Sequence, residues 1–294
     1  MYKIGKNAGK KWMAAVTAAF VTVAAATGCG KTDKAGAEER KETNSITVAA
    51  SSDTGSMDPA GSIALTYLTY SVSALDELLT FDADGEIDYR AAESYEVNED
   101  STVWTFHLRE EAVWSDGTPV TSADFLNTMT RALDPKSGSG YANYLFPIRN
   151  AEAIYNGEME IGELGVETPD DDTLIFYLEK PCVYFLDLLR LPVYTPSCST
   201  YAKETGSGWD TDPKTSVSNG PFYLAEYVPE QYMTLKKNES YWNADEVSLD
   251  EITYRFFDSQ EAMLYAYESG EADAATGLPS TVMSLYEGKE DLEI

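Results

Sequence analysis

Residues 103–133 constrain the fold most, because they set a strand, a tight turn and a helix in a fixed order. They read VWTFHLREEAVWSDGTPVTSADFLNTMTRAL. Trp104, Phe106 and Leu108 alternate with more polar residues, which predicts a strand with one buried face. The Asp-Gly pair at 116–117 predicts the turn. His107 is expected on the wetter face of the strand, as a surface or structural residue.

The helix in this segment has a start signal and an apolar face. Thr121 is a cap residue and Asp124 follows three positions later, the spacing of a capping box. Leu126, Met129 and Leu133 recur at helical spacing and should line one face. The segment therefore predicts a helix that packs on its surroundings through one side.

Further elements follow without a strict strand and helix alternation. Apolar residues within 65–79 recur at spacings of three and four, which predicts another helix. Strands are expected at TLIFYL, FYLAEYV, YMTLKKN and ITYRFF, and helices near 183–190 and 259–269. FDADGEIDY and TPDDDTL are best interpreted as turns, since a calcium loop at the first would need a further donor. This pattern predicts a mixed α/β (α+β) fold.

Charge and composition limit the partners. The chain has 21 Lys and Arg residues against 50 Asp and Glu residues, a formal net charge of −29. Such a field repels phosphate backbones, so we expect no nucleic-acid partner. A hydrophobic content of 43% suffices for a packed core in one large domain or two smaller ones.

The sequence AAATGCGKT, residues 24–32, allows two interpretations. As a phosphate-binding loop it lacks the first Gly, because Ala25 stands there, and the polar sequence after it cannot form a packed helix. As an export signal it has lysines before an apolar run at 12–27 and small residues leading into Cys29, which resembles the lipobox of bacterial lipoproteins. We expect a lipoprotein signal peptide at 1–28, lipidation of Cys29, and a flexible tether at 29–44. An ordinary signal peptide with an incidental Cys is the alternative.

The remaining chemistry is sparse. Cys182 and Cys198 could pair in an oxidising compartment or stay free. The sequence has no G-x-S-x-G, H-E-x-x-H or S-x-x-K motif, so we expect no enzyme, no metal and no cofactor. A glycosidase carboxylate pair among the acidic residues stays open, because only geometry could identify it.

Several ordered motifs resemble the solute-binding proteins of family 5, which serve ABC importers. The main match is VWTFHLREEAVWSDGTPVTSADF, with MDPA before it and GVETPDDDTLIFYLEKP, SNGPFYLAEY and YESGEADAA after it. The resemblance runs from about residue 46 to the end and is strongest to the oligopeptide branch. It implies a periplasmic-binding-protein-like two-lobed fold in which the second lobe, domain III, is missing from this chain.

The resemblance also implies a domain layout and site residues. Domain I would comprise 45–75 and 181–294, and domain II would comprise 76–180. The family's cleft positions correspond here to the following residues: Ile63, Ala64, Leu65, Tyr141, Thr276 and Gly277. Ile63 stands where the family often has Glu, and the last two stand where it often has amides, so charge and amide contacts are weakened. The Trp and Asp-Gly positions of the main motif are expected to be architectural.

By resemblance, the protein captures oligopeptides between its lobes and delivers them to ABC permease subunits. We expect a monomer, lipid-anchored at the cell membrane on its extracytoplasmic side. A dipeptide, nickel chelate or oligosaccharide ligand is the alternative within the family, and a secreted glycosidase is the alternative outside it.

Overall fold

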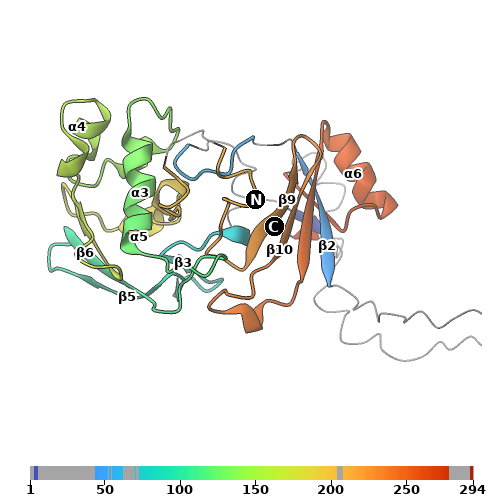
Figure 1. The fold of residues 1–294 in the computed structure, drawn as a ribbon, viewed down its shortest axis with the longest axis horizontal. Coiled ribbons are helices and arrows are strands. Elements are labelled where there is room, and N and C mark those ends of the chain that lie inside the picture. The colour runs from blue at the N-terminus through green and yellow to red at the C-terminus, as the bar shows by residue number, and fades with distance from the viewer. Residues whose placement is uncertain are drawn as a thin grey trace, which may run out of the picture.

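Two bodies lie side by side, one built on a four-stranded sheet and the other on a seven-stranded sheet (Figure 1). The computed structural model describes residues 3–5, 44–51, 53, 55–61, 70, 73–203, 208–277 and 292–293. The fold is mixed α/β, as the sequence pattern predicts. In the described part of the chain no helix is both long and apolar enough to cross a membrane.

The four-stranded sheet is antiparallel, in the order β5-β6-β8-β7. Its strands are β5 (Ala92–Val97), β6 (Val103–Leu108), β7 (Val166–Glu167) and β8 (Thr173–Tyr177). The predicted strand at 103–108 is confirmed: its second, fourth and sixth residues are buried, and His107 lies half-buried on the other face. Burying one aromatic side chain of this kind stabilises the fold by about 2 kcal/mol.

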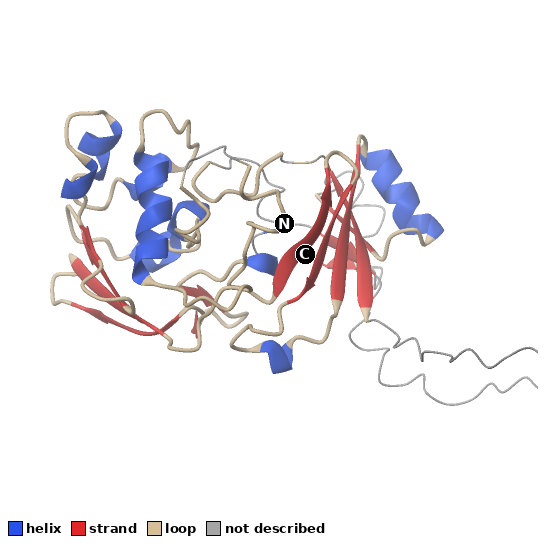
Figure 2. Ribbon diagram, viewed as in Figure 1, coloured by secondary structure: helices blue, strands red, loops and turns tan. Residues whose placement is uncertain are grey.

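Helix α3 (Ser122–Leu133) packs beside this sheet (Figure 2). The backbone N–H of Thr121 donates to the Asp124 carboxylate over 2.9 Å, which confirms the predicted start. Met129 and Leu133 are fully buried as expected, whereas Leu126 is only half-buried. Phe125, the residue before it, is fully buried instead. The smaller helices of this body are η1 (Ala142–Leu145), α4 (Ala151–Tyr155), η2 (Ile161–Glu163), α5 (Phe185–Leu188) and η3 (Pro192–Tyr194).

The predicted helix over 65–79 is wrong at its C-terminal end. Leu79 lies in strand β3 (Leu79–Phe81), which pairs with β4 (Ile87–Tyr89) in a hairpin. The turn takes up FDADGEIDY as expected, because the Asp82 carboxylate accepts the N–H groups of Asp84 and Glu86 over 2.9 Å each. Backbone pairing across the hairpin therefore overrides the helical spacing of the leucines; residues 62–69 lie outside the described residues.

The seven-stranded sheet has the order β13-β1-β12-β2-β11-β10-β9. Its strands are β1 (Lys3–Gly5), β2 (Ser45–Ser51), β9 (Phe222–Val228), β10 (Tyr232–Lys237), β11 (Glu251–Phe257), β12 (Ala274–Thr276) and β13 (Leu292–Glu293). Strand β2 runs parallel to both β11 and β12, and the other pairs are antiparallel. Helix α6 (Gln260–Ser269), within the range predicted from sequence, covers one face (Figure 2), and η4 (Ala244–Glu246) precedes β11. Strand β1, which lies between β13 and β12, belongs to the segment predicted to be a signal peptide, and that prediction stays open.

Three hydrophobic clusters form the core. The largest centres on Phe106, Trp114 and Phe176 and includes side chains from residues 182–217. The second lies on the seven-stranded sheet around Leu224 and Leu235, and the third lies between that sheet and α6. The predicted domain boundary near residue 180 stays a prediction, although residues just after it pack with the first cluster.

Candidate functional site

The carboxyl ends of three parallel strands meet at one edge of the seven-stranded sheet. Ser51 at the end of β2 pairs in register with Phe257 at the end of β11, and β12 ends beside β2 at Thr276. In open sheets with parallel strands, ligands bind outside the carboxyl ends of the strands. This edge, called the carboxyl edge below, is therefore the candidate binding site.

Two of the predicted site residues lie on the carboxyl edge. The Thr276 side chain is buried, at 8% exposure, and Gly277 after it is exposed with φ of +73°. An L residue rarely adopts this backbone conformation, which explains a Gly there. A Cβ added at Gly277 would lie 3.7 Å from Ser51 Oγ, an ordinary van der Waals distance, so the positive φ rather than lack of space favours Gly at this position.

A carboxylate fixes the chain where it leaves β2 at this edge. Asp53 Oδ2 accepts the Tyr227 hydroxyl over 2.5 Å and the Glu230 N–H over 2.9 Å, and both donors come from the end of β9 or the turn after it. Burial, and then the hydrogen bond to Asp53, raise the pKa of Tyr227 well above its usual range. The start of the segment that leads to Ile63, Ala64 and Leu65 is thereby held against the sheet; those three residues lie outside the described residues.

Tyr141 lies on the other body. It immediately precedes η1, is half-buried against the largest cluster, and its ring centroid lies 5.7 Å from that of Tyr144. The structure therefore places Tyr141 in a packed loop and the Thr276 to Gly277 pair on the carboxyl edge. Whether Tyr141 serves a ligand stays a prediction.

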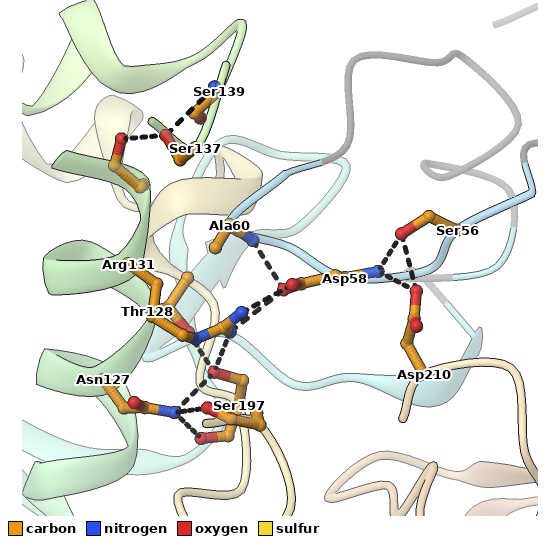
Figure 3. A network of polar contacts seen from close by, with 12 residues as sticks. Ser56, Asp58, Ala60, Asn127, Thr128, Arg131, Ser137, Ser139, Ser197 and Asp210 are labelled. Atoms are coloured by element: carbon orange, nitrogen blue, oxygen red, sulfur yellow. Dashed lines mark hydrogen bonds and ion pairs between the residues drawn. The ribbon is translucent and has the colours of Figure 1, made fainter. Parts of the chain in front are cut away.

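A buried ion pair joins the two bodies, and sequence reasoning missed it. Figure 3 shows Arg131 of α3 reaching Asp58, which follows β2 in the chain; their N–O distances are 2.5 and 2.9 Å in a bidentate pair. Arg131 also donates to Ser197 Oγ over 2.7 Å. The carboxylate of Asp210 accepts the backbone N–H groups of Met57 and Asp58 over 2.6 and 2.9 Å. Because both members of the pair are almost fully buried, the network fixes the segment after β2 against α3.

One sequence signal could have found this network. Asp124, Thr128 and Arg131 stand four and three positions apart on a helix whose other side is apolar. They form a polar stripe at helical spacing, and all three are buried. A polar stripe facing inward must find hydrogen-bond partners, since leaving it unpaired would cost several kcal/mol.

A second polar contact between the two bodies lies near the ends of β4 and β6. Asp76 and Asn219 exchange hydrogen bonds of 3.1 and 3.0 Å, and the indole N–H of Trp242 donates to Asp76 Oδ2 over 3.1 Å. The guanidinium of Arg109 lies 3.6 Å from the centre of the Trp242 ring. Burial raises the pKa of Asp76, although the hydrogen bond from Trp242 opposes the shift. Asn219 and Gly220 therefore have an architectural role in this contact.

The tryptophan and turn residues of the main motif are also architectural. Trp114 is 1% exposed in the largest cluster and donates its indole N–H to Asp124 over 3.1 Å. Gly117 has φ of +85° in the turn, and the Asp116 carboxylate accepts from Thr118 N–H over 3.0 Å. Both findings confirm the expectation from sequence.

The cysteines and possible metal ligands add no chemistry to the candidate site. Cys182 and Cys198 are both buried and free, so the alternative of a disulfide between them is not realised. Cys29 lies outside the described residues. Within the described ranges, no group of three His, Cys, Asp or Glu side chains could hold a metal ion.

Comparison with known proteins gives a family. The family described as bacterial extracellular solute-binding proteins, family 5 Middle, matches residues 86–294. The chain is 36% identical over 224 residues to the periplasmic oligopeptide-binding protein OppA of Escherichia coli, which covers 76% of this chain and 41% of that protein. It is 34% identical over 203 residues to the oligopeptide-binding protein OppA of Bacillus subtilis, covering 69% and 37%.

Solved structures agree with these relatives. OppA of Burkholderia pseudomallei superposes with a TM-score of 0.77 at 32% identity, covering 85% of this chain and 50% of that one. OppA of Haemophilus influenzae in complex with the peptide RPPGFSPFR gives 0.77 at 29% identity, covering 84% and 48%. The chain thus spans about half the length of the structures, and less of the curated relatives, that it matches.

Proposed function

Because the chain belongs to the bacterial extracellular solute-binding proteins of family 5, we propose that it captures oligopeptides for an ABC importer. The observation that carries this proposal is the 36% identity, over 224 residues, to a protein named for oligopeptide binding. A solved relative in complex with a nonapeptide sequence, RPPGFSPFR, supports the same ligand class. In this proposal the protein binds and delivers its ligand without any covalent step.

We propose the carboxyl edge as one wall of the binding cleft. An extended peptide can add its main chain to exposed backbone groups as a further strand, and such pairing is the same for every peptide sequence. Hydrated side-chain pockets then accept different residues, because water adapts its hydrogen bonds to the ligand. The site residues in this proposal are Ile63, Ala64, Leu65, Tyr141, Thr276 and Gly277.

We propose that sequence outside residues 1–294 forms the opposing lobe, domain III. Domain I would comprise 45–75 and 181–294, with domain II at 76–180 between its pieces. Closure of the two lobes would bury the peptide, and the closed form would be the one that the permease subunits bind. A lipid on Cys29, joined through the tether at 29–44, would hold a monomer at the outer face of the cell membrane.

A dipeptide is the second candidate ligand, since the dipeptide-binding protein DppE of Bacillus subtilis is 33% identical over 201 residues. A relative in Escherichia coli named as a probable deoxycholate-binding protein is 33% identical over 224 residues. These relatives show that ligand class varies among similar sequences. Ligand identity must therefore be measured.

Isothermal titration of the protein, as its gene encodes it, tests the proposal. The panel comprises a pentapeptide mixture, Ala-Ala, nickel chloride, maltotetraose and deoxycholate. Saturable heat at micromolar pentapeptide is the expected result. Binding of another panel member in place of the pentapeptides would overturn the peptide assignment, and hydrolysis of chromogenic glycosides would establish the glycosidase alternative.

A further inference from the structure

Two adjoining surface hollows lie beside α4, at the end of the molecule away from α6 (Figure 1). Their volumes are about 450 and 370 Å³. Phe146, Glu152 and Glu179 line both, so the hollows form one continuous surface, called the α4 surface below. None of these residues belongs to the carboxyl edge.

Backbone pairing makes the base of the α4 surface rigid. The N–H of Glu179 donates to the Pro147 carbonyl over 2.9 Å, and the N–H of Arg149 donates to the Tyr177 carbonyl over 2.8 Å. The Glu179 carboxylate accepts the Asn150 N–H over 2.8 Å. The carboxylate is thus held in place and keeps further acceptor capacity toward solvent.

One rim of the α4 surface exposes large apolar side chains. Val183 is 87% exposed and Tyr184 is 56% exposed, on the loop that follows Pro181. Phe146 forms a wall of the hollow, with its ring centroid 5.6 Å from that of Tyr155. Adjacent exposed apolar residues beside a hollow are typical of protein interaction sites.

The charge of the α4 surface indicates which kind of partner would bind it. Its lining carries three exposed carboxylates, on Glu152, Glu158 and Glu179, against one cation, Lys180, among the described lining residues. Arg149 is not a competing cation within the hollows, because its guanidinium lies over the Tyr177 ring at 4.7 Å. Carboxylates beside aromatic faces complement Lys or Arg side chains that alternate with apolar ones.

We propose that the α4 surface docks a basic segment of a partner protein, in which Lys or Arg side chains face the three glutamates and an apolar side chain packs on Tyr184. The partner segment is distinct from the transported ligand. The proposal does not depend on which ligand the carboxyl edge takes.

Fluorescence anisotropy with a labelled, terminally blocked peptide, Ac-Arg-Leu-Arg-Leu-amide, tests the proposal. Blocked termini remove the charged ends that a peptide cleft can recognise. We expect saturable binding, and a loss of affinity of about tenfold at low salt in the double variant Glu152→Gln, Glu179→Gln. Tyr184→Ser should also weaken binding, because the apolar contact is lost. Melting temperatures should stay unchanged, because all three side chains are exposed and the amide oxygen in Glu179→Gln can still accept the Asn150 N–H.

The control is the double variant Glu246→Gln, Glu261→Gln, which makes the same change in net charge on η4 and α6. It should bind the peptide as the unmodified protein does. Equal losses in both double variants would mean non-specific attraction and would overturn the proposal. Equally tight binding of Ac-Glu-Leu-Glu-Leu-amide, or spermidine competing as well as the peptide, would overturn it too.

Discussion

Arg131 and Asp58 form a bidentate, buried ion pair between residues 73 positions apart in the sequence. The side chains are 7% and 1% exposed. The pair holds the segment after β2 against helix α3 of the other body. This segment leads toward the proposed peptide-binding residues. A charge pair buried to this degree is stable only when both partners are present.

Replacing Arg131 should therefore destabilise the protein strongly. We expect Arg131→Met to lower the free energy of unfolding by about 3 to 5 kcal/mol, since it leaves the Asp58 carboxylate buried without its cation. Urea denaturation followed by circular dichroism measures the change. Arg255→Met is the matched control; its pair with Glu271 is exposed, and the expected loss is below about 1 kcal/mol. The double variant Asp58→Asn, Arg131→Met should lose less than the sum of the single variants, and simple additivity would contradict the coupling.

Gly220 should not tolerate a side chain. A Cβ there would lie 2.6 Å from the carbonyl carbon of Ala74 and 2.8 Å from the N of Leu75, both of them backbone atoms. We expect Gly220→Ala to cost about 1 to 3 kcal/mol of stability, because the two segments must separate. Gly162→Ala is the control, with nothing within 4 Å of the added carbon. Equal melting temperatures for the two variants would refute the close packing at Gly220.

Glu77 should contribute a loss of stability as the pH rises through the range 4.5 to 7. Burial, together with the nearby Asp76 carboxylate, raises the pKa of Glu77 from 4.5 to about 7. Between these values the folded state holds a proton that the unfolded state has released, so raising the pH favours unfolding. The contribution is at most about 3.5 kcal/mol, because one pKa unit corresponds to about 1.4 kcal/mol.

Glu77→Gln tests this assignment. The variant should unfold at higher urea concentration than the unmodified protein at pH 8, and the difference should shrink toward pH 4.5. Glu96→Gln, at an exposed position of β5, serves as the control and should leave the pH profile unchanged. A Glu77→Gln profile parallel to that of the unmodified protein would show that Glu77 is not the titrating group.

A variant of Tyr141 can show whether this residue contacts the ligand or only packs within its loop. If it lies in the peptide cleft, as we propose, Tyr141→Phe should weaken pentapeptide binding about tenfold while melting temperature changes little, since only a hydroxyl is removed. Tyr265→Phe, 70% exposed on α6, should leave affinity unchanged. Titration calorimetry compares the two. Unchanged peptide affinity in Tyr141→Phe would show that the hydroxyl of this residue makes no contribution to ligand binding.

Local structure was largely predictable because local sequence specifies it. The alternation of Trp104, Phe106 and Leu108 specifies strand β6, and Thr121 with Asp124 specifies the start of α3. The exception is Leu79, where helical spacing continues into a hairpin. Strand pairing with Tyr89 decided that position, and helical periodicity carries no information about such pairing.

The candidate site, too, was predictable in part from the sequence and in part only from the tertiary structure. The family resemblance pointed to Thr276 and Gly277, but only the parallel pairing of β12 and β11 with β2 brings their ends to one edge. Residue patterns along the chain were enough to predict strands β6, β8, β9, β10 and β11, the start of α3, the turns and the family. The tertiary structure alone decided the Arg131 to Asp58 pair, the carboxyl edge and the α4 surface, because each depends on contacts between distant segments whose meeting is set by the path of the chain.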